Sequence, residues 1–439
     1  MAFRPSGFWE YSPAEQRIFD KLLKTIENSY QSFWYTHIYT PAVEANKVLL
    51  AKNGEETGKQ IFWLYGLSQG PSDLKEYSLH FDLTVPFARY VLDRESELSF
   101  PFKRYQIQPV WRGERAQRGR LREFFQCDVD VIWRKDLGEN YLYYDSEIIF
   151  TLGKTMKQIF STLEINDTPC VHMSNRKLVI GFLEDLVGSE NIQSVMNLID
   201  KYKKIEKSEF IRLLGELQIS VESSEKICSF VETKWSLSEI EEIQTLSQNS
   251  QFQEGVNELK QVAQGLEKMQ KEFWEPFEYE IDFQIVRGLD YYTGTVFEFT
   301  LMKDSSLGSI CGGWRYEQLT WYIDPKRDCY AGVWGSIGIS RLLSKVFEEQ
   351  QYTQKTSTEY LFLCFPETLP QIFHLAGKMQ KEGKCIEIYP CPDKLGKQFW
   401  YADKKWIPFV VICGEGEMKD NIYKIKNMQT GEEKIYPLS

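Results

Sequence analysis

Two aromatic-rich stretches enclose the densest group of arginines in the chain. Residues 102–111 and 123–133 are rich in apolar and aromatic side chains, as strands are, and between them lie Arg112, Arg115, Arg118, Arg120 and Arg122. Gly113 and Gly119 allow a tight loop there. The pattern predicts a hairpin with a cationic loop. Planar guanidinium groups suit phosphate oxygens, so this loop is either a polyphosphate-binding site or a charged tip in water.

Polar residues alternate along the second of these predicted strands. Gln126, Asp128 and Asp130 are spaced two apart and therefore share one face. They form either a pocket for a small, polar, cationic ligand or a strand face in water. Asp82 and Thr84 have the same spacing, and a strand at 82–86 would point both side chains the same way.

Two glycine-containing segments follow later in the chain. In residues 287–294 two glycines bracket an Asp and two Tyr next to an Arg, which is more hydrogen-bonding capacity than a plain strand needs. Residues 335–341 lead from glycine into an apolar helix and end on Arg341. The second segment is either an anion site near a helix N-terminus or an ordinary strand-to-helix turn.

Composition restricts the class of protein. The chain has 439 residues, 42% hydrophobic and 15% aromatic, which excludes wholesale disorder and favours two or three domains. Its longest apolar runs, such as 407–413, are far shorter than the roughly 20 residues of a membrane span. Nine cysteines without a Cys-x-x-Cys pair, and only four histidines, argue against a disulfide framework and a structural zinc site. We therefore expect a protein of the reducing cytosol.

The net charge of −11 means that any nucleic-acid binding depends on local patches. Lysines and acidic residues balance within 358–439, at 11 each, so this region is less hostile to a polyanion than the rest. Helical spacing of apolar residues predicts a helix at 13–30 and a helical region at 177–273. The polar run 350–358 is the best linker candidate, and strand and helix patterns after it predict a small βαβ-type domain.

Taken together, these segments resemble the histidyl-tRNA synthetases, a family of class II aminoacyl-tRNA synthetases. Residues 82–90 and 102–126 resemble the strand before motif 2 and motif 2 itself, 287–294 the signature of histidine-activating enzymes, 335–341 motif 3, and 394–408 the anticodon-binding domain. The resemblance implies an α+β fold in which helices flank an antiparallel sheet. The catalytic domain would cover 1–357, with a helical insertion at about 175–273, and an α/β anticodon-binding domain would cover 358–439.

The resemblance also implies the reaction. A histidine–tRNA ligase activates L-histidine with Mg-ATP, giving histidyl-adenylate and diphosphate, and transfers the histidyl group to the 3′ end of histidine tRNA. The family further implies a cytoplasmic homodimer with no membrane partner, no metal ligands and no tightly bound cofactor. Two other interpretations remain: a catalytically silent, histidine-binding paralogue that regulates histidine biosynthesis, and a cytosolic scaffold with an arginine-rich hairpin.

Carried over residue by residue, the family's motifs assign a role to each candidate side chain. For ATP, Arg112 would hold the α-phosphate, Glu114 the adenine amino group, Phe124 the adenine ring and Arg341 the outer phosphates. For histidine, the segment of Asp82, Leu83 and Thr84 would bind the amino-acid end together with Gln126, and Asp130 and Tyr292 would bracket the imidazole with Tyr291 beside them. Arg287 would steady the carboxylate and the α-phosphate, which makes it catalytic together with Arg112.

Seven of the 12 tryptophans depart from the family's pattern, some of them where relatives have glycine: Trp34, Trp63, Trp133, Trp314, Trp321, Trp334 and Trp406. An indole cannot replace glycine where φ is positive or where the backbone must approach a ligand. A single cause explains all seven if the gene reads UGA as glycine and the printed chain was translated with UGA as tryptophan. If the indoles are real, the pocket around Trp314 and Trp334 is blocked.

Overall fold

The computed structural model describes residues 5–51, 60–64, 76–117, 119–135, 141–286, 292–318, 320–327, 329–349 and 356–438. The chain forms two compact units. The first comprises Met1–Trp9 and Leu22–Val346, and the second comprises Glu10–Lys21 and Phe347–Ser439. The predicted linker at 350–358 falls largely outside the described residues, so the domain limits at 357 and 358 stay a prediction.

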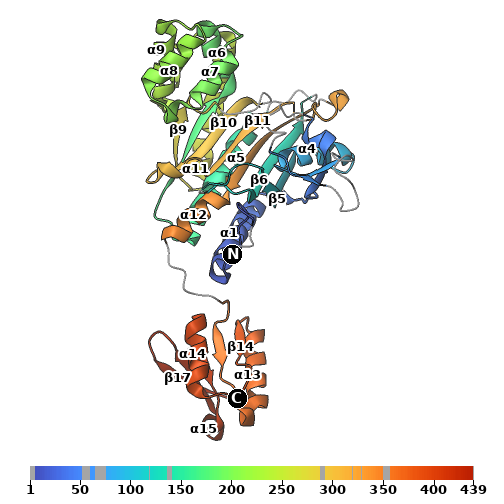
Figure 1. Ribbon diagram of the computed structural model, residues 1–439, viewed down its shortest axis with the longest axis vertical. Coiled ribbons are helices and arrows are strands. Elements are labelled where there is room, and N and C mark those ends of the chain that lie inside the picture. Colours follow the sequence, from blue (N-terminus) through green and yellow to red (C-terminus); the bar gives the residue numbers. More distant parts are fainter. Residues whose placement is uncertain are drawn as a thin grey trace. The chain divides into compact units, whose positions relative to one another are not determined.

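A nine-stranded, mostly antiparallel sheet forms the centre of the first unit (Figure 1). In sheet order its strands are β1 (Thr36–His37), β5 (Phe102–Trp111), β6 (Glu123–Arg134), β12 (Tyr330–Gly338), β11 (Cys311–Tyr316), β10 (Tyr292–Leu301), β7 (Pro169–Asn175), β9 (Glu278–Asp282) and β8 (Lys234–Trp235). Among the described strands of this sheet, only the pairs β1 with β5 and β7 with β9 run parallel. This sheet confirms the predicted α+β class.

Two long helices pack in successive layers against this sheet. The helix α5 (Leu142–Thr162) packs on β12, and α11 (Ser250–Glu272) packs on α5. The approach of α5 is close: a Cβ built on Gly335 of β12 would lie 2.4 Å from a methyl carbon of Leu152. Glycine at 335 is therefore required by helix-on-sheet packing, and a larger residue there would force α5 away.

The remaining elements of the first unit are shorter. The region predicted to be helical contains α6 (Arg176–Val187), α7 (Ile192–Ile199), α8 (Lys207–Glu216), α9 (Val221–Glu232) and α10 (Ile240–Gln244), seen as a green group in Figure 1. The predicted first helix is α1 (Pro13–Ser32), and α12 (Ile339–Glu349) follows β12; the division between the two units falls within both helices. A three-stranded sheet consists of β2 (Val43–Ala45), β4 (Tyr77–Leu79) and β3 (Trp63–Leu64), next to α2 (Asn46–Leu49).

One predicted strand is wrong. Residues 84–93 form the helix α4 (Thr84–Asp93), so Asp82 and Thr84 do not share a strand face. Pro86 lies in the first turn, where its missing N–H costs nothing. Phe87 and Val91 are four apart and both fully buried, so the helical period decides the structure.

The second unit contains a five-stranded sheet of order β14-β13-β15-β16-β17. The strands β14 (Ile386–Ile388) and β15 (Phe409–Ile412) both run parallel to β13 (Tyr360–Phe362), joined through α13 (Leu369–Lys381) and α14 (Leu395–Lys405). The predicted βαβ arrangement is thus present. The unit ends with α15 (Glu415–Lys419), β16 (Ile422–Asn427) and β17 (Glu433–Pro437).

Among the described residues, no helix combines the length and the apolar character that crossing a bilayer requires. All nine cysteines lie in the described part of the chain, and each is a free thiol.

Candidate active site

The arginine-rich segment is a loop that closes a long hairpin. The strands β5 and β6 pair from Phe102 opposite Ile132 to Trp111 opposite Glu123. The backbone N–H of Arg112 donates to the carbonyl of Arg122 at 2.8 Å and continues this ladder into the loop. The predicted hairpin is therefore confirmed, with the arginine-rich loop at its end.

A cleft of about 860 Å³ lies beside this hairpin. Its walls come from the hairpin, from the strands β10, β11 and β12, and from the helices α7 and α12. Five predicted site residues line it: Arg112, Glu114, Phe124, Gln126 and Arg341. The sequence-distant motifs thus meet at one cavity.

Backbone carbonyls fix the arginine side chains of this cleft. Arg112 donates from Nε to the carbonyl of Phe81 at 3.1 Å, and its guanidinium carbon lies 5.0 Å from the centre of the Phe124 ring. Arg341 donates from Nη1 to the carbonyl of Ser309. A guanidinium has five N–H donors, so one that is held by a carbonyl can bind more than one acceptor.

The predicted polar face of β6 is present and buried. Gln126, Asp128 and Asp130 stand opposite Gly338, Ser336 and Trp334 of the neighbouring strand β12. Asp128 accepts a hydrogen bond from the indole Nε1 of Trp334 at 2.8 Å and one from Gln126 at 3.3 Å. Burial raises the pKa of Asp128, because the charged form of the carboxyl group loses its solvation by water.

Asp130 is fully buried and bound on both carboxylate oxygens. Arg104 Nη2 lies 2.6 Å from Oδ2, and the Tyr316 hydroxyl donates to Oδ1 at 3.1 Å. Burial raises the pKa of Asp130 to about 7; Arg104 opposes this shift, while the charges of Asp128 and Asp82 add to it. Asp130 is therefore a carboxyl group that changes charge near neutral pH.

We expect Asp130→Asn to remove a pH dependence of stability. The folded-state pKa of about 7 lies above the roughly 3.9 of an exposed aspartate. The folded chain therefore binds the proton more tightly between these values, and the contribution of Asp130 to the free energy of unfolding falls as pH rises from about 4 to about 7. The difference in the free energy of unfolding between the Asn variant and the unsubstituted chain should therefore shift in favour of the variant as pH rises over this range, as measured by urea denaturation. Asp93→Asn, at an exposed carboxylate, is the control; a constant difference for Asp130→Asn would contradict the assignment.

Asp82, Leu83 and Thr84, the predicted partners of the amino-acid end, do not line the cleft. Asp82 accepts a hydrogen bond from the backbone of Val85 at 3.2 Å, where α4 begins, and Leu83 and Thr84 are buried beside it. The backbone of Tyr292 stands opposite Tyr316 in the sheet, next to the phenol that binds Asp130. The predicted residues Arg287 and Tyr291 lie outside the described residues.

Two groups at this site were missed by sequence reasoning. Arg104 is fully buried, and its guanidinium carbon lies 4.3 Å from the centre of the Phe87 ring while it pairs with Asp130. The signal was available: Arg104, Gln106 and Gln108 alternate on β5 as their partners do on β6. The hydroxyl of Tyr316 had no comparable signal, because its strand is short and rich in glycine.

Two tryptophans lie in the same cleft. Trp314 on β11 and Trp334 on β12 are opposite each other in register, and their ring centres are 4.1 Å apart. Both indoles line the cleft, and Trp334 covers Asp128 through the hydrogen bond described above. Two indoles thus line the cleft, and one of them is hydrogen-bonded to the buried Asp128.

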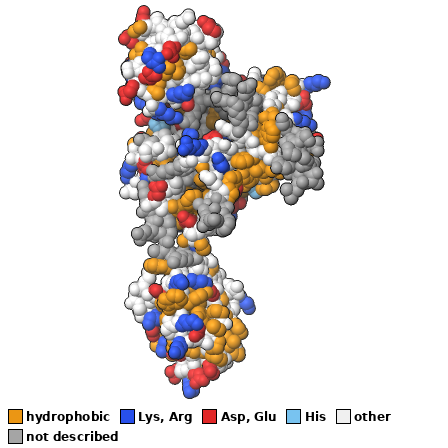
Figure 2. All heavy atoms as spheres, viewed as in Figure 1, with side chains coloured by type: hydrophobic (Ala, Val, Ile, Leu, Met, Phe, Trp, Pro, Cys, Tyr) orange, Lys and Arg blue, Asp and Glu red, His pale blue; other side chains and the backbone are white. Residues whose placement is uncertain are grey.

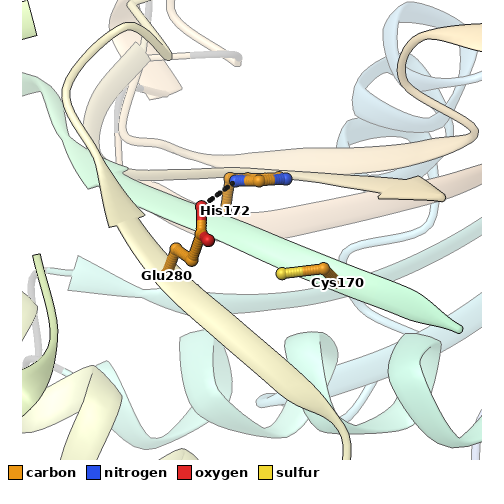
Figure 3. Close-up of side chains that lie close together, drawn as sticks. All are labelled: Cys170, His172 and Glu280. Atoms are coloured by element: carbon orange, nitrogen blue, oxygen red, sulfur yellow. Dashed lines mark ion pairs between the residues drawn. The ribbon is translucent and has the colours of Figure 1, made fainter. Parts of the chain in front are cut away.

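A second group of ligating side chains does not line the cleft. Cys170 and His172 of β7 and Glu280 of β9 come together in Figure 3, with His172 Nδ1 3.2 Å from a Glu280 carboxylate oxygen. The neighbouring carboxylate of Asp282, 3.7 Å from His172 Nδ1, pairs with both Lys203 and Lys234. Burial and acidic neighbours raise the pKa of the Cys170 thiol to about 12. These residues join β7 to β9, and we assign them no part in the cleft.

Comparison with known proteins agrees with this geometry. A family model described as histidyl-tRNA synthetase matches residues 7–332, and one described as anticodon binding domain matches 363–439. The chain is 38% identical to the histidine–tRNA ligase of Clostridium tetani, with 98% of this chain and 95% of the relative covered. For the histidine–tRNA ligase of Stenotrophomonas maltophilia the values are 37%, 97% and 93%.

Solved structures give the same result. The crystal structure of histidyl-tRNA synthetase from Nostoc sp. PCC 7120 superposes with a TM-score of 0.87 at 33% identity, covering 100% of this chain and 97% of that one. The central antiparallel sheet with its arginine-bearing hairpin is the catalytic fold of a class II aminoacyl-tRNA synthetase. Within that class, this chain belongs to the histidyl-tRNA synthetase family.

Proposed function

We propose that this chain is a histidine–tRNA ligase. In the first step the carboxylate oxygen of histidine attacks the α-phosphorus of Mg-ATP and the bond to diphosphate breaks, which gives histidyl-adenylate. In the second step a hydroxyl of the terminal ribose of histidine tRNA attacks the carbonyl carbon, and AMP leaves. The observation that carries the proposal is one cleft with arginines along its wall and buried carboxylates next to it, in a member of this family.

For ATP, the cleft offers a match to each part of the nucleotide. Arg112 would neutralise the α-phosphate as charge develops, and Arg341 would bind the outer phosphates. The ring of Phe124 would stack on adenine, and Glu114 would accept from its amino group. These steps need no protein nucleophile, since positioning and charge neutralisation dominate in phosphoryl chemistry.

For histidine, the proposed pocket lies where Asp130 approaches Asp82. The segment of Asp82, Leu83 and Thr84 would hold the amino-acid end with Gln126. Asp130 would accept a hydrogen bond from the imidazole, bracketed by Tyr292 with Tyr291 beside it, and Arg287 would act on the carboxylate. A buried acceptor fitted to a ring N–H rejects side chains that cannot complete the bond, and this is the strong form of selectivity.

For tRNA, we assign the catalytic domain to residues 1–357 with the insertion at about 175–273, and the anticodon-binding domain to 358–439. The matches at 7–332 and 363–439 support this division. In Figure 2 the visible face of the second unit carries lysines beside hydrophobic side chains. Two lysines of α14 are engaged internally, Lys397 with Asp393 and Lys405 with Glu387. A cytoplasmic homodimer that uses Mg-ATP as a substrate completes the proposal.

The regulatory-paralogue interpretation is less favoured. A chain described as an ATP phosphoribosyltransferase regulatory subunit/histidyl-tRNA synthetase from Bacillus halodurans C superposes with a TM-score of 0.72 at 20% identity, covering 94% of this chain and 98% of that one, which shows the fold alone. The present chain keeps Arg112 and Arg341 at the cleft, and it carries a match to the anticodon-binding domain. A histidine-binding regulator needs neither feature.

The test is transfer of labelled histidine to tRNA. The purified chain is expected to form acid-stable histidyl-tRNA in the presence of ATP, Mg²⁺ and histidine tRNA, and not with a tRNA of another specificity. If the chain binds histidine but supports neither histidine-dependent ATP–diphosphate exchange nor transfer of histidine to tRNA, the catalytically silent paralogue would be favoured instead.

A further inference from the structure

Three tryptophans have a backbone conformation that favours glycine. Among the described residues, six that are not glycine have positive φ, and three of these are Trp34 at 61°, Trp274 at 59° and Trp406 at 58°. The other three are Glu164, Gln218 and Asn421. The left-handed region costs an L-residue roughly 1–2 kcal/mol, and large side chains rarely enter it. Half of these positions are thus tryptophan, in a chain with 12 tryptophans among 439 residues.

All three tryptophans occupy the same place in a helix ending. Trp34 follows α1, Trp274 follows α11 and Trp406 follows α14. At Trp406 the backbone N–H donates to Asp403, and the next N–H donates to Ala402, both at 2.9 Å. The pairs are equivalent at Trp34, with Gln31 and Tyr30, and at Trp274, with Lys271 and Gln270. This is the Schellman ending, whose left-handed residue is usually glycine.

The chain contains a reference for this geometry. After α13 the left-handed residue is Gly383, with φ of 81°, and the same two hydrogen bonds run to Gln380 and Met379. Packing does not explain why the other three helix endings have a tryptophan where this one has glycine. The exposed fractions are 78% for Trp34, 87% for Trp274 and 48% for Trp406, so little buried area offsets the strain.

Trp314 and Trp334 lie in glycine-rich strands at the cleft. Trp314 follows Gly312 and Gly313, and Trp334 precedes Gly335. Their facing indoles, 4.1 Å apart at the ring centres, both line the cleft, and Trp334 stands opposite Asp130 in the sheet. Glycine at both positions would leave backbone alone there and open the cleft toward Asp128 and Asp130.

We infer that positions 34, 274, 314, 334 and 406 are glycine in the protein as its cells make it, because UGA codons of this gene are read as glycine. One cause then explains three strained helix ends and an obstructed cleft. That the opened space receives histidine rests on the proposed function; the identity of the five residues does not.

The structure supports glycine at some of the seven tryptophans identified from the sequence and not at others. Trp274 joins the set on backbone evidence alone. Trp133 lies in a regular strand, 1% exposed, with Arg315 4.8 Å from its ring centre, and the structure gives no backbone reason for glycine there. The same is true of Trp63 and Trp321, whose φ angles are not positive.

Mass spectrometry of the protein purified from its own cells tests the inference without any assay of activity. Trypsin releases each position in a peptide with a single printed tryptophan: 25–47, 272–287, 304–315, 328–341 and 406–419. Each of these should have the mass expected for glycine. The matched controls are peptides 105–112 and 398–404, which hold Trp111 and Trp400 and should keep tryptophan. Tryptophan in the five peptides, or UGG at their codons, would overturn the inference.

Two recombinant experiments complete the test. Trp274→Gly should raise the melting temperature by about 2–4 °C, whereas Trp400→Gly, inside α14, should lower it. The double variant Trp314→Gly, Trp334→Gly should gain histidine-dependent ATP–diphosphate exchange over the printed chain. If the peptides hold glycine and exchange is still absent, the proposed function fails and the inference stands. A lowered melting temperature for Trp274→Gly would count against the inference.

Discussion

Replacing Arg112 by alanine is expected to lower the rate of histidine-dependent ATP–diphosphate exchange by roughly 10²–10³-fold. Its guanidinium lines the cleft and is held in place by the carbonyl of Phe81 and the ring of Phe124. A preorganised cation at the α-phosphate acts mainly where charge develops, so the loss should appear in kcat more than in KM for histidine. The assay uses whichever chain carries exchange, with tryptophan or with glycine at 314 and 334.

The matched control for this variant is Arg115→Ala. Arg115 belongs to the same loop and carries the same charge, but it is exposed and does not line the cleft. Its removal should change the exchange rate less than about threefold, as expected for a solvent-screened charge. Equal losses in the two variants would show that the loop acts through its total charge, and Arg112 would lose its assigned position at the α-phosphate.

The second large effect concerns stability away from the cleft. Asp145 of α5 pairs with Arg315 of β11 at 2.7 Å, with side chains 0% and 4% exposed. Asp145→Asn would remove the nearest counter-charge of the buried Arg315 guanidinium, which cannot give up its proton, and the pair of Arg315 with the half-exposed Glu317 at 3.4 Å compensates for it less well. We expect a loss of roughly 3–5 kcal/mol in the free energy of unfolding at pH 8, measured by urea denaturation.

The control for that experiment is an exposed ion pair. Glu97→Gln breaks the pair of Arg94 with Glu97, whose side chains are 52% and 62% exposed, and should cost less than about 1 kcal/mol. Comparable effects of the two substitutions would mean that the Arg315 guanidinium regains water when Asp145 is neutralised. The buried pair would then not hold α5 on the sheet.

Local patterns predicted the parts of this fold that local physics decides. The alternation of Gln126, Asp128 and Asp130 placed them on one strand face, and the glycine-bounded arginines predicted the loop of the hairpin. The strand predicted at the start of residues 84–93 was wrong because a short apolar run fits the period of a strand as well as that of a helix. The helix is selected there by burial of Phe87 and Val91.

The charge partners of the site were beyond local patterns. Whether Arg104 meets Asp130 depends on the register of β5 against β6, which the whole hairpin sets. The backbone conformation of Trp274 could not be predicted from local sequence patterns either. Its sequence neighbours give no sign of a left-handed residue, and only the hydrogen bonds at the end of α11 reveal one.

The most direct test of the account is ATP–diphosphate exchange by the protein from its own cells, with each of the 20 standard amino acids in turn. Histidine alone should support exchange, because the buried carboxyl of Asp130 is matched to an imidazole N–H. Exchange that depends on another amino acid, or its complete absence from the folded protein, would contradict the proposal that this cleft activates histidine.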